Sequence, residues 1–235
     1  ESWIMSLAFS PDGRILASGS ADEHIHFWSP TSGESFGTFT GHRDYVRSLV
    51  FNQEEILLDQ TPYQAGSLLL SASDDGYVLL WDLAQGRAID IFASVPNAAI
   101  WAADFGPDET TIIAGGASDT LTVWNIDSSP VLGSTLIDHT EQILSIDFHP
   151  TEPLFATAGG LDSDYAIRIW NPDTETLVAT LEGHGAPVSS VVFNPQMTTQ
   201  LISADLERMI LVWDTETSAI VHSIEFTDSV FSLDF

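Results

Sequence analysis

The sequence predicts an all-β chain made of five four-stranded antiparallel sheets and one additional strand. Two markers repeat with a common period near 43 residues. Tryptophans recur at positions 28, 81, 124, 170 and 213, and phenylalanines recur at positions 9, 51, 105, 148, 193 and 235. Strand-favouring residues precede both markers, and no segment has the apolar period of an amphipathic helix. Because the two markers share one spacing, the chain is predicted to repeat a single structural unit.

Each period contains the pattern of four short strands. One run ends at the repeating phenylalanine, a second follows it, a third ends at the repeating tryptophan, and a fourth comes after a turn. The third runs cover residues 24–28, 77–81, 120–124, 166–170 and 209–213. Turn residues such as Ser10-Pro11-Asp12-Gly13 separate the runs. We therefore predict repeats at about residues 1–40, 41–93, 94–136, 137–181 and 182–226, with the start of a sixth at 227–235.

Two dipeptides in these periods resemble the signatures of the WD-repeat β-propeller family. Trp-Asp stands at positions 81–82 and 213–214, with Trp-Asn at 124–125 and 170–171 and Trp-Ser at 28–29. Gly-His stands at 41–42 and 183–184, with Asp138-His139 as a variant. The resemblance covers essentially the whole chain. It implies blades of four strands in a ring that usually has six to eight blades, so this chain is expected to be a segment of a longer ring.

The resemblance also implies a hydrogen-bonded network in each blade, which joins the tryptophan, a strand serine, a turn aspartate and the histidine. In the second repeat these residues are Trp81, Ser71 or Ser73, Asp75 and His42. The fourth repeat has His139, Asp164 and Trp170, with glycine in place of the nearby serines, and the fifth has His184, Ser203 and Trp213, with Glu207 at the turn. The third has Asn97 near the histidine position and Ser118 and Asp119 at the turn, so no network is expected there.

The charge balance excludes several classes of partner. Acidic residues number 34 against six arginines and no lysine, which gives a formal net charge of −28. A surface this negative repels nucleic-acid phosphates and anionic lipid headgroups, so neither nucleic acid nor a membrane is an expected partner. No apolar run approaches the roughly 18 residues of a transmembrane helix. The absence of cysteine excludes disulfides and thiol chemistry.

The residues needed for catalysis or metal binding are not assembled in any known motif. The sequence contains no His-Glu-x-x-His, no Gly-x-Ser-x-Gly and no phosphate-binding glycine loop. His24 and His26 alternate on one predicted strand and would need a third ligand to hold a metal. Asp162 and Asp164 bracket an enlarged turn that could hold Ca²⁺, although solvated turn carboxylates are the favoured interpretation. No catalytic residue, metal or cofactor is predicted, and the chain is expected not to be an enzyme.

The remaining function class is a protein–protein interaction scaffold that docks a protein or peptide on the face around the central channel. By resemblance, that face is contacted by residues at the start of each first strand and beside the turn aspartate. The matching positions are Trp3, Met5, Tyr45, Arg47, Asp74, Trp101, Leu144 and Phe231. Aromatic side chains and arginine dominate binding energy at interface centres, and Arg47 is expected to meet a carboxylate of the partner. Trp101 shares strand parity with Phe105, so it could instead pack inside.

Two alternatives stay open at this stage. Residues 52–66 form an unusually apolar insertion in the second repeat, which is either an interaction element or a lid on its own blade. At the level of the whole chain, the alternative to a scaffold is a structural module that self-assembles into a surface or filament lattice. An enzyme or sensor module is the third possibility.

Overall fold

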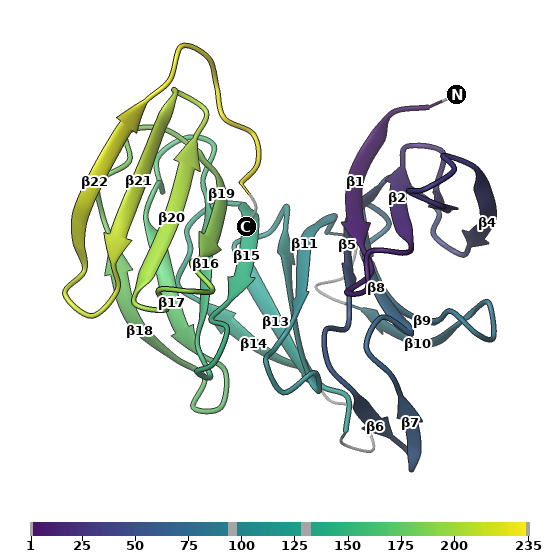
Figure 1. Cartoon of the computed structure of the whole chain (residues 1–235). Coiled ribbons are helices and arrows are strands. Elements are labelled where there is room, and N and C mark those ends of the chain that lie inside the picture. The colour runs from purple at the N-terminus through teal and green to yellow at the C-terminus, as the bar shows by residue number, and fades with distance from the viewer. Residues whose placement is uncertain (1, 94–97, 128–132, 234–235) are drawn as a thin grey trace. The chain divides into compact units, whose positions relative to one another are not determined.

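The computed structural model describes residues 2–93, 98–127 and 133–233 (Figure 1). The chain divides into two compact units, one of residues 1–114 and 124–134 and the other of residues 115–123 and 135–235. The described residues form strands, turns and loops. No helix long and apolar enough to cross a membrane occurs among them.

Five antiparallel sheets of four strands carry the fold. The first contains β1 (Ile4–Phe9), β2 (Leu16–Ser20), β3 (His24–Trp28) and β4 (Ser35–Thr40), and the second contains β5 (Val46–Phe51), β8 (Leu68–Ser73), β9 (Tyr77–Asp82) and β10 (Arg87–Ala93). The third contains β11 (Ile100–Phe105), β12 (Thr111–Gly116), β13 (Thr120–Asn125) and β14 (Gly133–Ile137). The fourth contains β15 (Ile143–Phe148), β16 (Phe155–Gly159), β17 (Ile167–Asn171) and β18 (Thr176–Leu181), and the fifth contains β19 (Val188–Phe193), β20 (Gln200–Asp205), β21 (Met209–Asp214) and β22 (Ala219–Glu225).

The predicted sheets are confirmed, and the five repeating tryptophans lie on the third strand of each sheet. Trp81, Trp124, Trp170 and Trp213 are buried, whereas Trp28 in the first sheet is only half-buried. Trp28 therefore differs from the other four in its burial.

The core of the first unit explains why the middle strands are apolar on both faces. Side chains of a strand alternate between the two faces of its sheet. Leu68 and Leu70 of β8 join a cluster with Phe105 and Ile112 of the third sheet. The intervening Leu69 joins a different cluster with Phe27 of the first sheet. Because the second sheet is covered on both faces, β8 begins with three successive leucines and is buried over its whole length.

The second unit has an equivalent core. Ile167 and Ile169 of the fourth sheet share a cluster with Val191, Phe193 and Trp213 of the fifth. These two sheets therefore pack face to face, as sheets do when each buries one apolar face against its neighbour.

The first strand of four sheets has the same irregularity near its start. Its pairing with the second strand shifts register between Ile4 and Ser6, between Val46 and Ser48, between Ile143 and Ser145, and between Val188 and Ser190. The ladder skips the residue between each of these pairs, which is Met5, Arg47, Leu144 and Ser189 respectively. Such a bulge bends the strand and re-aims the extra side chain.

The predicted first strand of a sixth repeat is not formed over its described residues. Residues 226–233 contain no strand. They lie along the fifth sheet, where the Val230 carbonyl accepts a hydrogen bond from Ser189 Oγ at 2.6 Å and the Leu233 amide donates to Ser190 Oγ at 3.1 Å. No described segment offers these residues a ladder partner, which is why the apolar pattern alone does not make them a strand.

Candidate functional site

A tryptophan, a hydroxyl, a histidine and a carboxylate form one chain of hydrogen bonds in the second sheet. Trp81 Nε1 donates to Ser71 Oγ at 2.8 Å, and His42 Nε2 lies 2.7 Å from the same oxygen. His42 Nδ1 lies 2.9 Å from Asp75 Oδ2. A carboxylate only accepts, so Nδ1 carries the proton, and Nε2 accepts from the Ser71 hydroxyl. Each polar side-chain atom that links Trp81, Ser71, His42 and Asp75 therefore has a matching donor or acceptor.

The choice between Ser71 and Ser73 is resolved by these contacts. Ser71 is the member of the network. Ser73 Oγ instead donates to the Asp44 carbonyl at 3.1 Å and accepts from the Asp75 amide at 3.2 Å, so it shapes the turn that carries Asp75.

The fifth sheet repeats the network with a different carboxylate from the one expected. Trp213 Nε1 donates to Ser203 Oγ at 2.7 Å, and His184 Nε2 lies 2.6 Å from that oxygen. The partner of His184 Nδ1 is Asp205 Oδ2 at 2.8 Å, so the assignment of Glu207 was wrong. Glu207 stands six residues before Trp213, as Asp75 stands six residues before Trp81. Asp205 reaches the histidine from the end of β20, two residues earlier.

In the fourth sheet the hydroxyl comes from a threonine. Trp170 Nε1 donates to Thr157 Oγ1 at 2.8 Å, and His139 Nε2 lies 2.8 Å from the same oxygen. The expectation that glycine had removed this hydroxyl was wrong. Thr157 stands nine residues after Phe148, as Ser18 stands nine after Phe9.

Arg168 adds a cation to this fourth network. Its Nη1 donates to His139 Nδ1 at 2.8 Å and to Asp164 Oδ1 at 2.9 Å, and its Nε donates to Asp138 Oδ2 at 2.7 Å. Burial and the neighbouring Arg168 guanidinium lower the pKa of His139 to about 4, so the imidazole is neutral. Burial also lowers the pKa of His184, against the opposing effect of Asp205.

The third sheet carries alanine at the hydroxyl position. Ala114, nine residues after Phe105, is fully buried in β12 and has no group to accept from the tryptophan. Asn97, expected near the histidine position, lies outside the described residues. In the turn, Ser118 Oγ donates to the Thr120 carbonyl at 3.3 Å, and Asp119 Oδ1 accepts from Thr120 Oγ1 at 3.1 Å.

Four of the predicted partner-binding residues meet in the first unit. Arg47 binds Asp74 through both carboxylate oxygens, at 2.9 and 3.0 Å from Nε and 2.6 Å from Nη2. Trp101 Nε1 donates to Asp74 Oδ1 at 3.1 Å, and the Arg47 guanidinium lies 5.3 Å from the centre of the Tyr45 ring. Asp74 therefore fixes an arginine and an indole beside a tyrosine that is 36% exposed.

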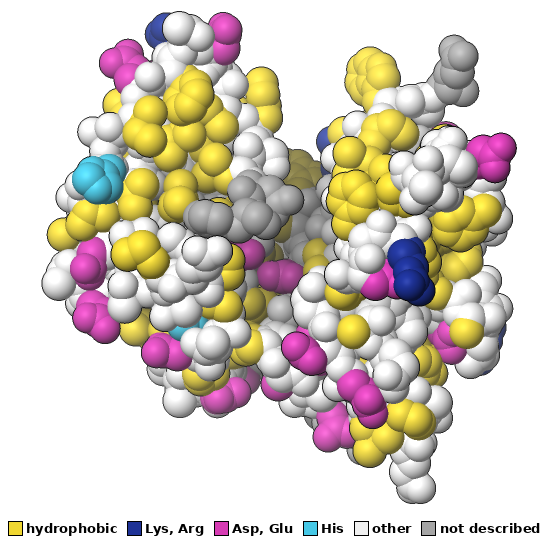
Figure 2. Space-filling model, in the orientation of Figure 1, with side chains coloured by type: hydrophobic (Ala, Val, Ile, Leu, Met, Phe, Trp, Pro, Cys, Tyr) yellow, Lys and Arg dark blue, Asp and Glu magenta, His cyan; other side chains and the backbone are white. Residues whose placement is uncertain are grey.

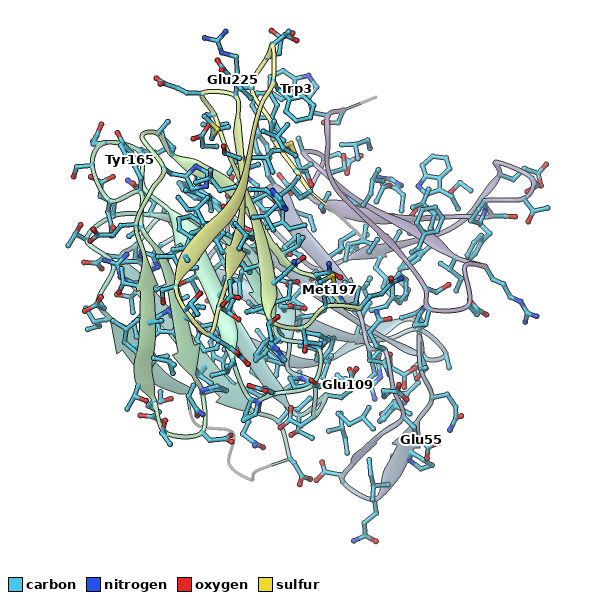
Figure 3. The ribbon with its side chains drawn as sticks, turned by 60° about the vertical axis from the view of Figure 1, so that its left-hand side comes forward. Trp3, Glu55, Glu109, Tyr165, Met197 and Glu225 are labelled. Carbon is cyan, nitrogen blue, oxygen red and sulfur yellow. The ribbon has the colours of Figure 1, made fainter. Side chains whose placement is uncertain are left out.

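Trp3 and Met5 lie in the same unit at the start of the first sheet. Trp3 precedes β1 and is 75% exposed, and its indole projects from the ribbon in Figure 3. Trp3 and Tyr45 line one open cavity of about 470 Å³, together with Ser2 and Ala21. Met5 is the half-buried bulge residue of β1.

The WD domain, G-beta repeat profile of the WD40 family matches residues 1–29, 33–82, 92–125, 131–171 and 175–214. The chain belongs to the WD40 family. Similar proteins include Periodic tryptophan protein 2 of Arabidopsis thaliana, 27% identical over 94% of this chain and 23% of the relative. The guanine nucleotide-binding protein subunit beta of the same plant is 24% identical over 93% of this chain and 59% of the relative. Nuclear distribution protein nudF of Aspergillus niger is 27% identical over 85% of this chain and 46% of the relative.

This WD40 chain therefore spans between about a quarter and three fifths of the length of these relatives. WD40 repeat proteins generally act as non-catalytic interaction scaffolds that bind other proteins.

Two expectations about the WD40 docking surface are changed by the structure. Arg47, expected to meet a carboxylate of the partner, is already paired with Asp74 of its own unit. Trp101 is half-buried and hydrogen-bonded, so it is neither a core residue nor a freely exposed one. Leu144, half-buried, and Phe231, 75% exposed, belong to the second unit.

The enlarged turn considered for Ca²⁺ is filled by a side chain of the same unit. Glu141 Oε2 accepts from the amides of Leu161 and Asp162, both at 2.7 Å, and Glu141 Oε1 accepts from Ser163 Oγ at 2.8 Å. A turn that directs amide N–H groups inward binds an anion and not a cation. Asp164 is meanwhile committed to Arg168 and the Thr140 amide.

The histidine pair in β3 lies beside Asp22. His26 Nε2 lies 3.0 Å from Asp22 Oδ2, and His24 contacts the Asp22 carbonyl. Among the residues that the structure describes, no group of three or more histidines and carboxylates could hold a metal ion.

Proposed function

We propose that this chain is a docking scaffold without catalytic activity. We propose further that a protein or peptide binds it at a surface in its first unit. That surface, the bulge-side surface, consists of Trp3, Met5, Tyr45, Arg47, Asp74 and Trp101. Membership of the WD40 family supports the general function. The observation that supports this location is the cluster in which Asp74 binds both Arg47 and Trp101 beside the ring of Tyr45.

The bulge that recurs in four sheets places an arginine at this position of the second sheet. Val46 and Leu49, on either side of Arg47, remain buried in the cluster shared by the first two sheets. Arg47 itself leaves the ladder and reaches Asp74 in the β8–β9 turn. Bulges are frequent next to functional sites because they turn one side chain toward a ligand.

The chemistry of the bulge-side surface suits a protein partner. Tryptophan, tyrosine and arginine are the residues most enriched at interface hot spots. Asp74 holds Arg47 and Trp101 in place before binding, so less side-chain entropy is lost when a partner docks. Self-assembly is disfavoured by comparison, because each copy carries a formal net charge of −28.

The proposal is tested by Trp3→Ala and by the double variant Tyr45→Ala with Arg47→Ala. Trp3 has an exposed side chain, so Trp3→Ala should leave the thermal melt unchanged and reduce retention of the partner in a pull-down from native lysate. The matched control is Tyr77→Ala with Arg87→Ala, an exposed tyrosine and arginine on β9 and β10 of the same unit. Full retention by both test variants, with unchanged melting, would place the docking site elsewhere.

A further inference from the structure

The insertion at residues 52–66 folds into a β-hairpin. β6 (Ile56–Leu58) pairs with β7 (Thr61–Tyr63), and the hairpin projects away from the strands of its own sheet (Figure 1). Its turn residues Asp59 and Gln60 have φ of 47° and 66°. Two successive left-handed residues are the conformation of a two-residue hairpin turn that matches the twist of the strands.

One face of the hairpin is built into the core. Ile56 is buried in the cluster that joins the second and third sheets, and Leu58 and Tyr63 pack against that cluster. Ile56 pairs with Tyr63 across the hairpin, so both strands contribute to this face. The lid interpretation therefore describes this half of the insertion.

The base of the hairpin is held by two buried polar side chains. Asn52 Nδ2 donates to the carbonyls of Glu54 and Gln64 at 2.8 and 2.9 Å, and its Oδ1 accepts from the Leu68 amide at 2.9 Å. Glu109, from the β11–β12 turn, accepts through Oε1 from the amides of Gln53 and Glu54 at 2.8 and 3.1 Å. These five hydrogen bonds fix both ends of the hairpin to its own unit.

The other face of the hairpin is exposed and apolar. Leu57 is 59% exposed, and it pairs across the hairpin with Pro62, which is also exposed. Burial of Leu57 in a partner would remove its apolar surface from water, and no core contact is lost, because the residues facing the core lie on the opposite face.

Acidic side chains surround this exposed pair. Glu54, Glu55 and Asp59 are all exposed, and residues 52–66 contain no lysine or arginine. Figure 2 shows hydrophobic and acidic side chains next to each other over the hairpin. A second copy of this chain would bring more negative charge to the hairpin, whereas a basic partner would be attracted to it.

We propose that the β6–β7 hairpin is a second docking element, which inserts Leu57 into an apolar cleft rimmed by lysine or arginine on a partner protein. It lies at the opposite end of β5 from Tyr45 and Arg47 and does not depend on the bulge-side surface. The clamp of Asn52 and Glu109 presents Leu57 in a fixed orientation, which lowers the entropy lost on binding.

The experiment places a photo-crosslinking residue, p-benzoylphenylalanine, at position 57 of the intact chain in native lysate. The matched control carries it at Met197, an exposed apolar residue of the second unit. The protein captured at position 57 is then purified, and its affinity for the unlabelled chain is measured by titration calorimetry. We expect Leu57→Ser to weaken binding by about tenfold or more, as loss of one buried anchor does.

The charge of the partner is tested with the triple variant Glu54→Gln, Glu55→Gln and Asp59→Asn, which should weaken binding and reduce its dependence on salt. Trp3→Ala tests the independence of the two surfaces, and it should leave this affinity unchanged. The proposal is overturned if position 57 captures no more protein than position 197, or if Leu57→Ser binds normally. A covalent dimer of the chain, or a triple variant that behaves as wild type, would overturn the assignment of a basic partner.

Discussion

Arg168 Nη1 donates a hydrogen bond to His139 Nδ1 over 2.8 Å, and this contact reverses the direction of the fourth network. Because Nδ1 accepts from the guanidinium, the proton of the neutral imidazole lies on Nε2, which donates to Thr157 Oγ1. The carboxylate of Asp164 lies farther from His139 Nδ1, at 3.4 Å. In the second and fifth sheets a carboxylate lies 2.9 and 2.8 Å from Nδ1, so the proton lies on Nδ1. The same WD40 network therefore runs with two opposite proton arrangements in one chain.

The first prediction concerns these tautomers. His42 and His184 are expected as the Nδ1–H form at pH 7, and His139 as the Nε2–H form. Nitrogen-15 chemical shifts of the three imidazoles measure this directly, because the protonated and unprotonated ring nitrogens differ widely in shift. A shared tautomer in all three rings would contradict the arrangement.

The second prediction concerns the origin of the reversal. Asp138 stands where the second and fifth repeats have Gly41 and Gly183, and Arg168 stands where they have Leu79 and Leu211. A Cβ added at Gly41 would lie 2.8 Å from the Trp81 ring and 3.5 Å from Leu79. Glycine therefore leaves the space that the leucine and the tryptophan ring occupy in that repeat. Arg168→Leu alone leaves Asp138 beside an apolar side chain and should lower the free energy of unfolding.

Adding Asp138→Gly to Arg168→Leu should recover part of that loss and move the His139 proton to Nδ1. A double-mutant cycle by urea unfolding is expected to give a coupling of about 1–3 kcal/mol between the two positions. Additive effects, within error, would mean that the two residues do not act as a pair.

The third prediction concerns acid stability. The unfolded histidine has a pKa near 6.5, and burial and Arg168 lower the pKa of His139 to about 4 in the folded chain. The unfolded state then binds more protons between these values, so this residue's contribution is complete above pH 6.5 and is lost as the pH falls to 4. The loss is on the order of 3 kcal/mol. Unfolding of wild type and His139→Gln between pH 4 and 7 measures it, and parallel pH profiles would contradict it.

The fourth prediction concerns Glu109 at the base of the hairpin. Burial raises the pKa of Glu109 above 4.5, the amides of Gln53 and Glu54 oppose the rise, and the carboxylates of Glu54 and Asp108 add to it. Among the described residues Oε2 has no hydrogen-bond partner. The folded state therefore binds the proton more tightly, and stability from this group falls as the pH rises from 4.5 through the raised pKa.

Glu109→Gln keeps the acceptor for both amides and cannot ionise. Its stability relative to wild type should increase as the pH rises above 4.5. Hydrogen exchange at the Gln53 and Glu54 amides should then follow only the intrinsic base-catalysed pH dependence, without the additional change caused by ionisation of Glu109. A stability difference that is constant from pH 4 to 8 would show that Glu109 does not change its charge there.

The repeat and its strands could be predicted because strand periodicity and a regular marker depend only on local sequence. Thr157 and Asp205 were missed for a different reason. A hydroxyl or carboxylate from a nearby position can make the same hydrogen bond. A fixed number of residues before the tryptophan therefore does not identify the group that makes it. The pairing of Arg47 with Asp74 joins residues 27 apart and depends on a bulge, for which the sequence carries no clear signal.

Hydrogen exchange of the intact chain, measured with and without a captured partner, shows whether that partner docks on the bulge-side surface. We expect slower exchange at residues 2–5, 44–48 and 100–102, with a separate zone at 53–63 for a partner of the hairpin. Protection confined to the outer strands β4, β10, β18 and β22 would contradict it.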